Sequence, residues 1–347
     1  MAHELDIDKF IANSRTYPVL DVRSPSEFSQ GHLPGAFNLP LFNDEERAQV
    51  GTLYKQEGRQ KALKKGLEIV GPKMRYFVEK VEELNHSASN AILAHCWRGG
   101  MRSESMGWLL ETAGFKASTL KGGYKAFRNW VLAYFDQPLT LIVVGGYTGS
   151  GKSEILANLA NMGEQVLDLE GHARHKGSAF GHLGEAGQPT GEQFENNLAY
   201  ELGDMDPARP IWVEDESRLI GRRCLPEGLY TQMGQAPLIC VDIPFNRRIE
   251  RLVREYAIFS DEQLKESIHK ISKRLGGLRT KQALEAIERK EYEEAARITL
   301  TYYDKVYQYS LDTRNSYTTI EIDDPSDPGN AERLCNRGYE LIHSKTG

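Results

Sequence analysis

Residues 94–103, AHCWRGGMRS, place one cysteine between an apolar stretch and a glycine-containing turn that carries two arginines. A cysteine at the end of a buried strand, followed by such a turn and a helix, has its sulfur where several backbone N–H groups converge. These amides and the helix N-terminus bind anions and favour the thiolate form of the side chain. We therefore expect Cys96 to be a catalytic thiolate, with Arg98 adding positive charge and Arg102 holding an oxyanion through two parallel hydrogen bonds.

Two chemistries use a loop of this kind, and the loop alone does not separate them. Cys96 and Arg102 are separated by five residues, which is the spacing of protein tyrosine phosphatases, where the cysteine attacks phosphorus. The alternative is transfer of sulfur or selenium, in which the thiolate carries the transferred atom as a persulfide or perselenide. A loop of five residues suits an anion the size of phosphate or selenophosphate.

A second loop, GYTGSGKS at 146–153, matches G-x-x-x-x-G-K-[ST], follows an apolar strand and precedes a helix. In that context the backbone amides cradle a di- or triphosphate, the lysine reaches the outer phosphates and the serine can bind Mg²⁺. A further strand, WVEDES at 212–217, ends in carboxylates that can lie beside the same ion. The residues expected to bind the phosphates and the ion are Gly146, Gly149, Gly151, Lys152, Ser153 and Asp215. The motif does not identify the phosphate ligand.

The composition predicts a cytoplasmic protein of two or three domains. The chain has 347 residues, of which 40% are hydrophobic and 27% are charged, which is ordinary for a globular protein. Its apolar runs fall far short of the roughly 18 residues that cross a bilayer, and its acidic N-terminus does not resemble a signal peptide. Its four cysteines are widely spaced, without a Cys-x-x-Cys pair, which argues against a disulfide framework and against a structural metal site.

The net charge of −6 hides two basic segments. Residues 246–281 contain ten basic and five acidic side chains, and residues 55–80 contain eight basic and three acidic ones. Each segment is either a solvated helix surface or a binding site for a polyanion. Two such segments beside two anion-binding loops favour the polyanion, with Arg247, Arg248 and Arg251 as contacts to its phosphates.

Strands and helices alternate through residues 1–136 and again, after the short linker DQPLT, up to residue 245. This alternation predicts an α/β fold with parallel sheets covered by helices on both faces. Beyond Phe245 the chain is charged and helical, and it ends with the strand-like YTTIEID. The predicted domains are 1–136, a P-loop NTPase-like domain at 137–245, and a basic helical extension at 246–347 that packs on the P-loop domain.

The first domain resembles the rhodanese family. The segment VLDVRSPSEFSQGHLPGAFNLPL (19–41) has a strand ending Asp-x-Arg, a Glu-Phe pair, Gly-His-x-Pro-Gly-Ala and Asn-x-Pro, and LKGGYKAFRNW (120–130) resembles the family's terminal Gly-Gly turn and helix. The resemblance covers about 1–135 and implies a rhodanese-like fold with sulfur or selenium chemistry at Cys96. The loop departs from most sulfurtransferases, which have four residues where this chain has five, and this keeps the phosphatase alternative open.

Nearly the whole chain resembles the tRNA 2-selenouridine synthase family. The similarity is carried by HCWRGGMRS, GGYTGSGKSE, DLEGHARHKGSAFG (168–181), FENNL (194–198), VEDESRLIG (213–221) and YYDKVYQYSLD (302–312). It implies an enzyme that replaces sulfur by selenium in a 5-substituted 2-thiouridine at wobble position 34 of tRNA. Geranyl diphosphate in the P-loop would first geranylate the sulfur, and selenium from selenophosphate would then displace geranylthiol.

The same resemblance implies partners and further binding residues. The partners are tRNA and an enzyme that produces selenophosphate, without a membrane. His175 and Lys176 are implied to bind substrate anions, although the family usually has Leu where His172 stands and Arg where Lys176 stands. Whether Cys96 carries a perselenide or only orients selenophosphate stays open at this point.

Two other functions remain compatible with the two loops. One is a cysteine-dependent phosphatase or a small-molecule kinase, and the other is a non-catalytic regulator that senses an anion and a nucleotide. The tyrosines 302, 303 and 307 either belong to a helical core or stack on a splayed anticodon base.

Overall fold

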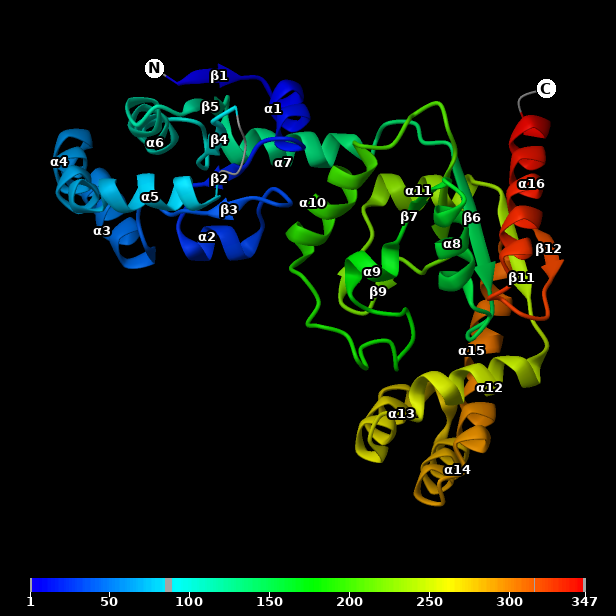
Figure 1. Ribbon diagram of the computed structural model, residues 1–347. Coiled ribbons are helices and arrows are strands. Elements are labelled where there is room, and N and C mark those ends of the chain that lie inside the picture. Colours follow the sequence, from blue (N-terminus) through cyan, green and yellow to red (C-terminus); the bar gives the residue numbers. More distant parts are fainter. Residues whose placement is uncertain (1, 85–88, 315, 346–347) are drawn as a thin grey trace. The chain divides into compact units, whose positions relative to one another are not determined.

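The computed structural model describes residues 2–84, 89–314 and 316–345 and divides the chain into two compact units. The first unit comprises Met1–Tyr134 and Glu195–Tyr200, and the second comprises Phe135–Phe194 and Glu201–Gly347. Figure 1 shows their helices and strands. Among the described helices, none combines the length and the apolar character needed to span a bilayer.

A five-stranded parallel sheet forms the centre of the first unit, with strand order β1-β5-β4-β2-β3. Leu20 and Ile92 on its strands pack against Phe77, Met106 and Leu110 of the surrounding helices, and this apolar burial provides the main stabilisation. The strands are β1 (His3–Leu5), β2 (Val19–Asp21), β3 (Phe37–Asn38), β4 (Ala91–His95) and β5 (Lys116–Leu120). The helices are α1 (Ile7–Ser14), α2 (Pro25–Gln30), α3 (Asp44–Glu57), α4 (Arg59–Val70), η1 (Gly71–Lys73), α5 (Met74–Leu84), α6 (Met101–Thr112) and α7 (Gly123–Tyr134).

The register of β2 against β4 pairs Asp21 with His95 at the carboxyl edge of this sheet. Asp21 accepts hydrogen bonds from Arg23, whose Nε lies 3.0 Å and whose Nη2 lies 2.6 Å from the carboxylate. Arg23 also donates to the carbonyl of Gly31 at 2.6 Å and lies 3.7 Å from the ring centroid of Tyr124. Because this ion pair is fully buried and its hydrogen bonds are satisfied, it specifies one geometry for the loops at this edge.

The basic segment 55–80 runs from the end of α3 through α4 and η1 into α5. Several of its charges form ion pairs with acids one turn away, such as Lys65 with Glu68 at 2.9 Å and Arg75 with Glu79 at 2.7 Å. Such exposed pairs contribute little stability and are typical of a solvated helix surface.

The second unit has its own five-stranded parallel sheet, with strand order β12-β11-β6-β8-β7. These strands are β6 (Leu141–Gly146), β7 (Gln165–Leu167), β8 (Ile211–Glu214), β11 (Leu238–Asp242) and β12 (Thr318–Glu321). A two-stranded antiparallel ribbon, β9 (Leu219–Ile220) with β10 (Arg223–Cys224), comes between β8 and β11 in the chain. The central strand β6 is buried along its whole length, as its unbroken apolar sequence predicts.

The helices of this unit cover the sheet and extend beyond it. They are α8 (Lys152–Asn161), α9 (Leu169–Ala173), α11 (Glu227–Gln235), α12 (Phe245–Tyr256), α13 (Asp261–Leu275), α14 (Gly277–Glu288), α15 (Tyr292–Asp312) and α16 (Pro328–Lys345). Helix α10 (Gly191–Leu202) begins and ends in the second unit, and its middle, Glu195–Tyr200, belongs to the first. Figure 1 shows α12, α13, α14 and the start of α15 grouped together, below the sheet in that view.

The C-terminal third of the chain is part of this second unit and not a separate body. Strand β12 pairs with β11 at the edge of the sheet, and Gly338 of α16 packs closely against the ring of Trp212 on β8. The two parallel sheets covered by helices, with a largely helical C-terminal part, confirm the predicted α/β fold class.

Candidate functional site

The cysteine loop of the first unit connects β4 to α6. Cys96 is only 4% exposed, and the Ser103 hydroxyl lies 3.3 Å from its Sγ, in position to donate a hydrogen bond. The same hydroxyl accepts from the backbone N–H of Gly100 at 3.3 Å. The hydroxyl also lies 3.1 Å from the carbonyl of Gly100, so its one proton is donated either to that carbonyl or to the sulfur. Donation to Sγ would stabilise negative charge on it.

Two glycines give this loop its shape. Gly99 and Gly123 both have positive φ, 59° and 60°, and their backbones pack against each other. A Cβ on Gly123 would come within 2.8 Å of the backbone nitrogen of Arg98, so no larger residue fits there. The N–H of Tyr124 donates to the carbonyl of Cys96 at 2.8 Å. The turn at Gly122 and Gly123, where α7 begins, therefore packs directly against the backbone of the cysteine loop.

Arg102 is held by Glu27 of helix α2. Its Nη1 lies 2.9 Å from Glu27 Oε2, and Nε of Arg47 lies 3.6 Å from the same oxygen. Burial by itself raises the pKa of Glu27, but the hydrogen bond and the charge of Arg102 outweigh it and lower the pKa below its usual value. Glu27 is therefore ionised and orients Arg102 at the start of α6, whereas Arg98 is exposed.

Buried His95 lies behind the loop. Its Nε2 is 3.8 Å from Asp21 Oδ2, and neither ring nitrogen has a hydrogen-bond partner among the described residues. Burial lowers the pKa of His95, so the ring is neutral at physiological pH. We assign no proton transfer to it.

The phosphate loop of the second unit connects β6 to α8. Three of its glycines have positive φ (Gly146 154°, Gly149 83°, Gly151 74°), which explains why the motif requires glycine there. A Cβ on Gly149 would lie 3.1 Å from the carbonyl of Arg248, because the loop packs directly on α12. Lys152 starts α8, and its Nζ donates to the carbonyl of Gly146 at 3.1 Å, so the ammonium folds over the loop.

Tyr307 of α15 joins the phosphate loop to Asp215. Its hydroxyl accepts the N–H of Gly146 at 2.7 Å and donates to Asp215 Oδ2 at 3.0 Å. The other oxygen of Asp215 accepts from Arg314 Nη2 at 2.7 Å. Both oxygens of Asp215 are therefore engaged by side chains.

A pair of carboxyl groups, Glu170 and Glu216, lies near the end of the phosphate loop. Glu170 accepts a hydrogen bond from the Ser153 hydroxyl at 3.2 Å and is hydrogen-bonded to Glu216. Burial and the charge of Glu170 raise the pKa of Glu216 to about 8, and burial also raises the pKa of Glu170. The two carboxyl groups therefore share a proton at neutral pH, beside Lys152.

These groups line one cleft of about 990 Å³. Its walls include the phosphate loop, Glu170 and Glu216, and the cations Lys176, Arg251 and Arg314. Within the described part of the chain, no three His, Cys, Asp or Glu side chains are arranged to hold a metal ion. The arrangement suits a phosphorylated ligand, with amides and cations toward its anionic end.

Comparison with known families gives two matches, a rhodanese-like domain at residues 6–130 and the tRNA 2-selenouridine synthase AAA domain at residues 139–325. A protein named tRNA 2-selenouridine synthase from Pseudomonas fluorescens (strain Pf0-1) is 39% identical over 285 residues, 76% of either chain. Proteins of the same name from Sulfurovum sp. (strain NBC37-1) and Bdellovibrio bacteriovorus are 38% and 36% identical, over 86% of this chain and 90% of their own length. The chain belongs to the tRNA 2-selenouridine synthase family.

Family membership confirms the resemblance seen in the sequence, while the roles of individual residues stay predictions. The structure brings Gly146, Gly149, Gly151, Lys152 and Ser153 together in one loop and places Lys176 and Arg251 on the same cleft. Lys176 forms an ion pair with Glu255 at 2.5 Å, and Arg251 forms one with Glu154 at 2.7 Å. His175 lies instead against Gly221, and burial lowers its pKa, so it is neutral.

The three arginines predicted to bind tRNA do not form one surface. Arg247 is exposed and pairs with Glu250 at 3.1 Å. Arg248 is buried, donates from both Nη atoms to Asp304 at 2.8 Å and reaches the carbonyl of Thr148 at 3.2 Å. Its burial argues against a contact with a tRNA phosphate and makes Arg248 a residue that positions the phosphate loop.

Sequence reasoning did not find the roles of four residues that shape these sites, Glu27, Glu170, Tyr307 and Arg314. The sequence indicates Tyr307 only as a core residue or as a stacking partner for a base, and it does not predict the contacts with Gly146 and Asp215. Glu27 belongs to the rhodanese-like Glu-Phe pair, and Glu170 lies in the family-like motif DLEGHARHKGSAFG just after β7, so the sequence carried a signal for both. Tyr307 and Arg314 come from the far end of the chain, and nothing in their local sequence connects them to Asp215.

The raised pKa of Glu216 predicts how the cleft responds to pH. Between pH 7 and 9 the residue loses its proton and adds a negative charge beside Lys152. With EDTA present, raising the pH from 7 to 9 should increase the Kd for inorganic pyrophosphate in both proteins. The factor of increase should be roughly tenfold larger in the parent than in Glu216→Gln. Calorimetric titration of both proteins across this range measures the difference, and the titration of pyrophosphate itself cancels. Parallel pH profiles would contradict the assignment.

Proposed function

We propose that this protein is an enzyme that replaces sulfur by selenium in a 5-substituted 2-thiouridine at wobble position 34 of tRNA. The observation that carries the proposal is the presence, in a chain of this family, of two separate anion-binding loops with different reactive groups. One surrounds the buried thiol of Cys96, and the other carries Lys152 over a diphosphate-sized cradle. Two loops suit a reaction in two steps.

In the first step, the phosphate loop binds the diphosphate of geranyl diphosphate. The thiouridine sulfur attacks the first carbon of the geranyl group, the carbon–oxygen bond breaks, and pyrophosphate leaves with the electron pair. Lys152 turns from the carbonyl of Gly146 to the leaving oxygens and stabilises their charge. No ATP hydrolysis is needed.

Ser153 and Glu170 are the residues that fit Mg²⁺ in this cleft. Their side-chain oxygens lie 3.2 Å apart at the end of the phosphate loop, and hard oxygen donors are the ligands that Mg²⁺ prefers. Asp215 fits less well, because Tyr307 and Arg314 engage both of its oxygens. A bound ion would help to neutralise the leaving pyrophosphate.

In the second step, selenium displaces geranylthiol. Alkylation converts the thiocarbonyl into an S-alkyl isothiourea, from which a thiol leaves much more readily than sulfide leaves a thiocarbonyl. The selenium of selenophosphate bonds to C2 of the uracil ring, the bond from C2 to sulfur breaks, and geranylthiol leaves with a proton. Water then cleaves the selenium–phosphorus bond and releases phosphate. Cys96 orients selenophosphate in its loop, and Ser103 and Arg102 stabilise the anion beside it. An enzyme that produces selenophosphate supplies the donor, and both steps take place in the cytoplasm.

The experiment that tests this function is mass spectrometry of tRNA nucleosides. The protein is incubated with 2-thiouridine-containing tRNA, geranyl diphosphate and selenophosphate, and 2-selenouridine is the expected product. Hydrolysis of a generic aryl phosphate through Cys96, or ATP turnover through Lys152, in place of this product would favour the phosphatase or kinase alternative.

Lys152→Ala should abolish geranylation, with a loss of about a hundredfold or more, because the charge on the leaving pyrophosphate is no longer neutralised. ATP should compete with geranyl diphosphate weakly or not at all. The exposed Lys9→Ala, outside both basic segments, serves as the control and should retain the parent rate. Stoichiometric ATP hydrolysis during selenation would count against a prenyl diphosphate in this loop.

Cys96→Ser should stop selenation and leave geranylation intact, because it replaces a thiolate by an un-ionised hydroxyl. Geranylated tRNA should then accumulate, and Arg102→Ala should act in the same direction but less completely. Nucleoside mass spectrometry measures both products, with the exposed Cys224→Ser as the control. Formation of 2-selenouridine at the parent rate by Cys96→Ser would show that the thiol is dispensable.

Charge reversal at Arg247 should weaken tRNA binding and flatten its salt dependence. Each lost phosphate contact lowers the slope of log K against log salt by roughly 0.9. Filter binding across salt concentrations measures this slope, and Arg289→Glu, another exposed and ion-paired arginine, is the control. Equal slopes for the parent and Arg247→Glu would assign the residue to a solvated helix surface.

A further inference from the structure

An apolar groove lies between helix α6 and the helix pair α3 and α4 in the first unit. Its walls include Met101 and Leu109 of α6, Tyr54 of α3, and Leu63 and Leu67 of α4. Met101 is the first residue after the cysteine loop, and Arg102 also lines the groove. One end of the groove therefore lies beside the anion position of the cysteine loop.

The apolar side chains of this groove are exposed to solvent. Leu67, Tyr54 and Trp108 keep 63%, 57% and 53% of their surface exposed. Several large apolar side chains gathered on one exposed surface are typical of a binding site. Covering them with an apolar ligand removes this surface from water, which is favourable.

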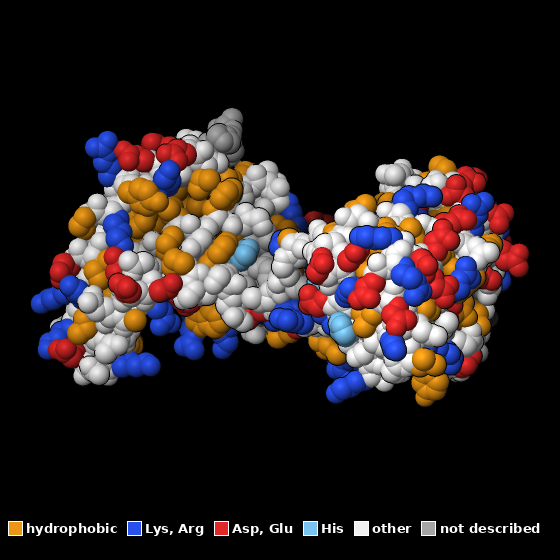
Figure 2. Space-filling model, turned by 90° about the horizontal axis from the view of Figure 1, so that it is seen from below, with side chains coloured by type: hydrophobic (Ala, Val, Ile, Leu, Met, Phe, Trp, Pro, Cys, Tyr) orange, Lys and Arg blue, Asp and Glu red, His pale blue; other side chains and the backbone are white. Residues whose placement is uncertain are grey.

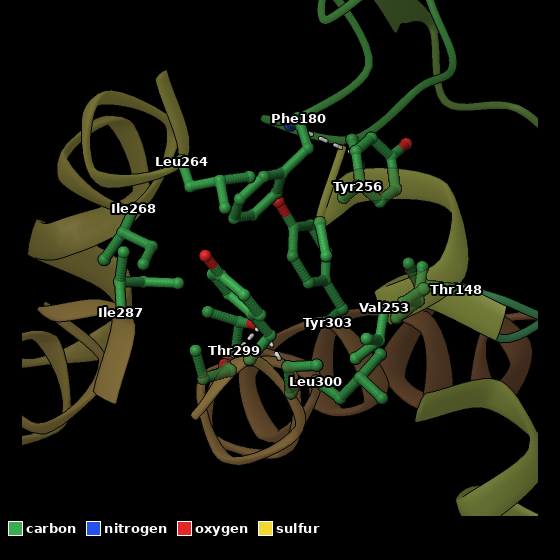
Figure 3. Close-up of a pocket in the computed structure, with 16 residues that line it drawn as sticks. Thr148, Phe180, Val253, Tyr256, Leu264, Ile268, Ile287, Thr299, Leu300 and Tyr303 are labelled. Carbon is green, nitrogen blue, oxygen red and sulfur yellow. Dashed lines mark hydrogen bonds between the residues drawn. The ribbon is translucent and has the colours of Figure 1, made fainter. Parts of the chain in front are cut away.

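The groove has room for a ten-carbon chain. Its volume is about 540 Å³. Ten carbon groups, each roughly as large as a water molecule in the liquid, occupy about 300 Å³. The wall from Met101 to Leu109 is about 12 Å long, and an extended eight-carbon backbone is about 9 Å long. By contrast, the apolar cavity that Phe180, Ile268 and Tyr303 line in the second unit has a volume of only about 60 Å³ (Figure 3).

Cations border this groove. Arg47 lines it, and its Nε lies 3.6 Å from the Glu27 oxygen that also holds Arg102. Lys55 lines it as well, and Nη2 of Arg59 lies 3.7 Å from Sδ of Met101. A ligand that combines a hydrocarbon chain with a polyanionic backbone can bury the chain here and place its phosphates beside these cations.

We propose that this groove binds the geranyl chain of S-geranylated tRNA during the selenation step. The proposal rests on the proposed function, because that function supplies the alkylated tRNA. The chain lies along α6, and the sulfur that carries it lies at the Arg102 end, where selenophosphate is held.

The groove gives the second step its selectivity. Each buried methylene group strengthens binding by about fourfold, so the alkylated intermediate binds the first unit more tightly than tRNA that carries an unalkylated 2-thiouridine. The tRNA whose sulfur leaves readily is therefore the one held beside selenophosphate.

Two changes in the groove wall test the proposal. Gly51 of α3 lines the groove, and among the described residues a Cβ on it would meet only the Arg47 guanidinium, at 3.8 Å, so Gly51→Phe fills the groove without strain. Leu67→Gln removes an apolar contact at an exposed position. Synthetic anticodon stem-loops that carry S-geranyl- or S-methyl-2-thiouridine serve as substrates for selenation with selenophosphate.

The quantity to measure is the ratio of kcat/KM for the S-geranyl substrate to that for the S-methyl substrate. It should fall at least about tenfold in Gly51→Phe and about fivefold in Leu67→Gln, because the chain loses its contacts while the methyl group had none to lose. The intrinsic reactivities of the two thioethers cancel between variants. Geranylation of 2-thiouridine-containing tRNA should continue at the parent rate in both variants, and circular dichroism checks that each is folded.

Leu132→Gln is the matched control, because Leu132 is an exposed leucine on helix α7 of the same unit and does not line the groove. Its ratio should equal that of the parent. An unchanged ratio in Gly51→Phe, or an equal fall in Leu132→Gln, would overturn the proposal and leave the groove as a contact surface for an apolar segment of a protein partner.

Failure of the proposed function gives a different result. If the parent binds the S-geranyl stem-loop more tightly than the S-methyl one in filter binding, and Gly51→Phe removes this preference, but no 2-selenouridine forms, the groove stands and the second step falls. If the parent makes 2-selenouridine from both stem-loops and Gly51→Phe does so with the same ratio, the second step stands and the groove falls.

Discussion

The hydroxyl group of Tyr307 is the contact on which the geometry of the second unit most depends. It accepts the N–H of Gly146 and donates to Asp215, so one atom connects the first residue of the phosphate loop to the end of strand β8. Burial raises the pKa of Tyr307 strongly, which keeps the proton needed for donation to Asp215. Because α15 also carries Tyr303, whose hydroxyl accepts the N–H of Ala179, the same helix contacts both the phosphate loop and the segment that follows Ser178.

A buried ion pair plays the corresponding part in the first unit. Asp21 and Arg23 lie at the end of β2, next to the start of the cysteine loop, and Tyr124 packs over the guanidinium while its N–H holds the carbonyl of Cys96. Removing one partner from such a pair leaves an uncompensated buried charge, which costs about 3–5 kcal/mol. The pair therefore ties the strand edge, the Gly-Gly turn and the reactive thiol into one arrangement.

The charges of this protein divide into two kinds. Most of the basic side chains of 55–80 and 246–281 that contact acids do so at the surface, and Figure 2 shows acidic and basic groups interspersed over the helical part of the second unit. The charges around the phosphate loop are different, because burial forces Glu170 and Glu216 to share a proton beside Lys152. Local burial, and not the net charge of the chain, therefore sets the protonation of these two carboxyl groups.

Much of the organisation could be predicted from the sequence. The alternation of apolar strands with amphipathic helices determined two parallel sheets, since periodicity and turn residues act over a few positions. The phosphate loop was predicted for the same reason, because its glycines, Lys152 and Ser153 are neighbours in the chain and need only a strand before and a helix after them. The cysteine loop and the Gly-Gly turn were likewise visible as two short motifs.

Only the tertiary structure decided what lies opposite those loops. Arg248 stands in a basic run that predicts a surface contact, yet Asp304, 56 residues later, draws it into the interior beneath Thr148. The sequence makes Asp215 a candidate ligand for Mg²⁺, but in the folded protein Tyr307 and Arg314 engage both of its oxygens. The apolar cavity lined by Phe180, Ile268 and Tyr303 is formed by four helices and a loop, so no single segment of the sequence predicts it. Short-range periodicity determines which elements form, but the partner of each buried charge and the walls of each cavity depend on packing between residues far apart in the chain, which a local pattern does not encode.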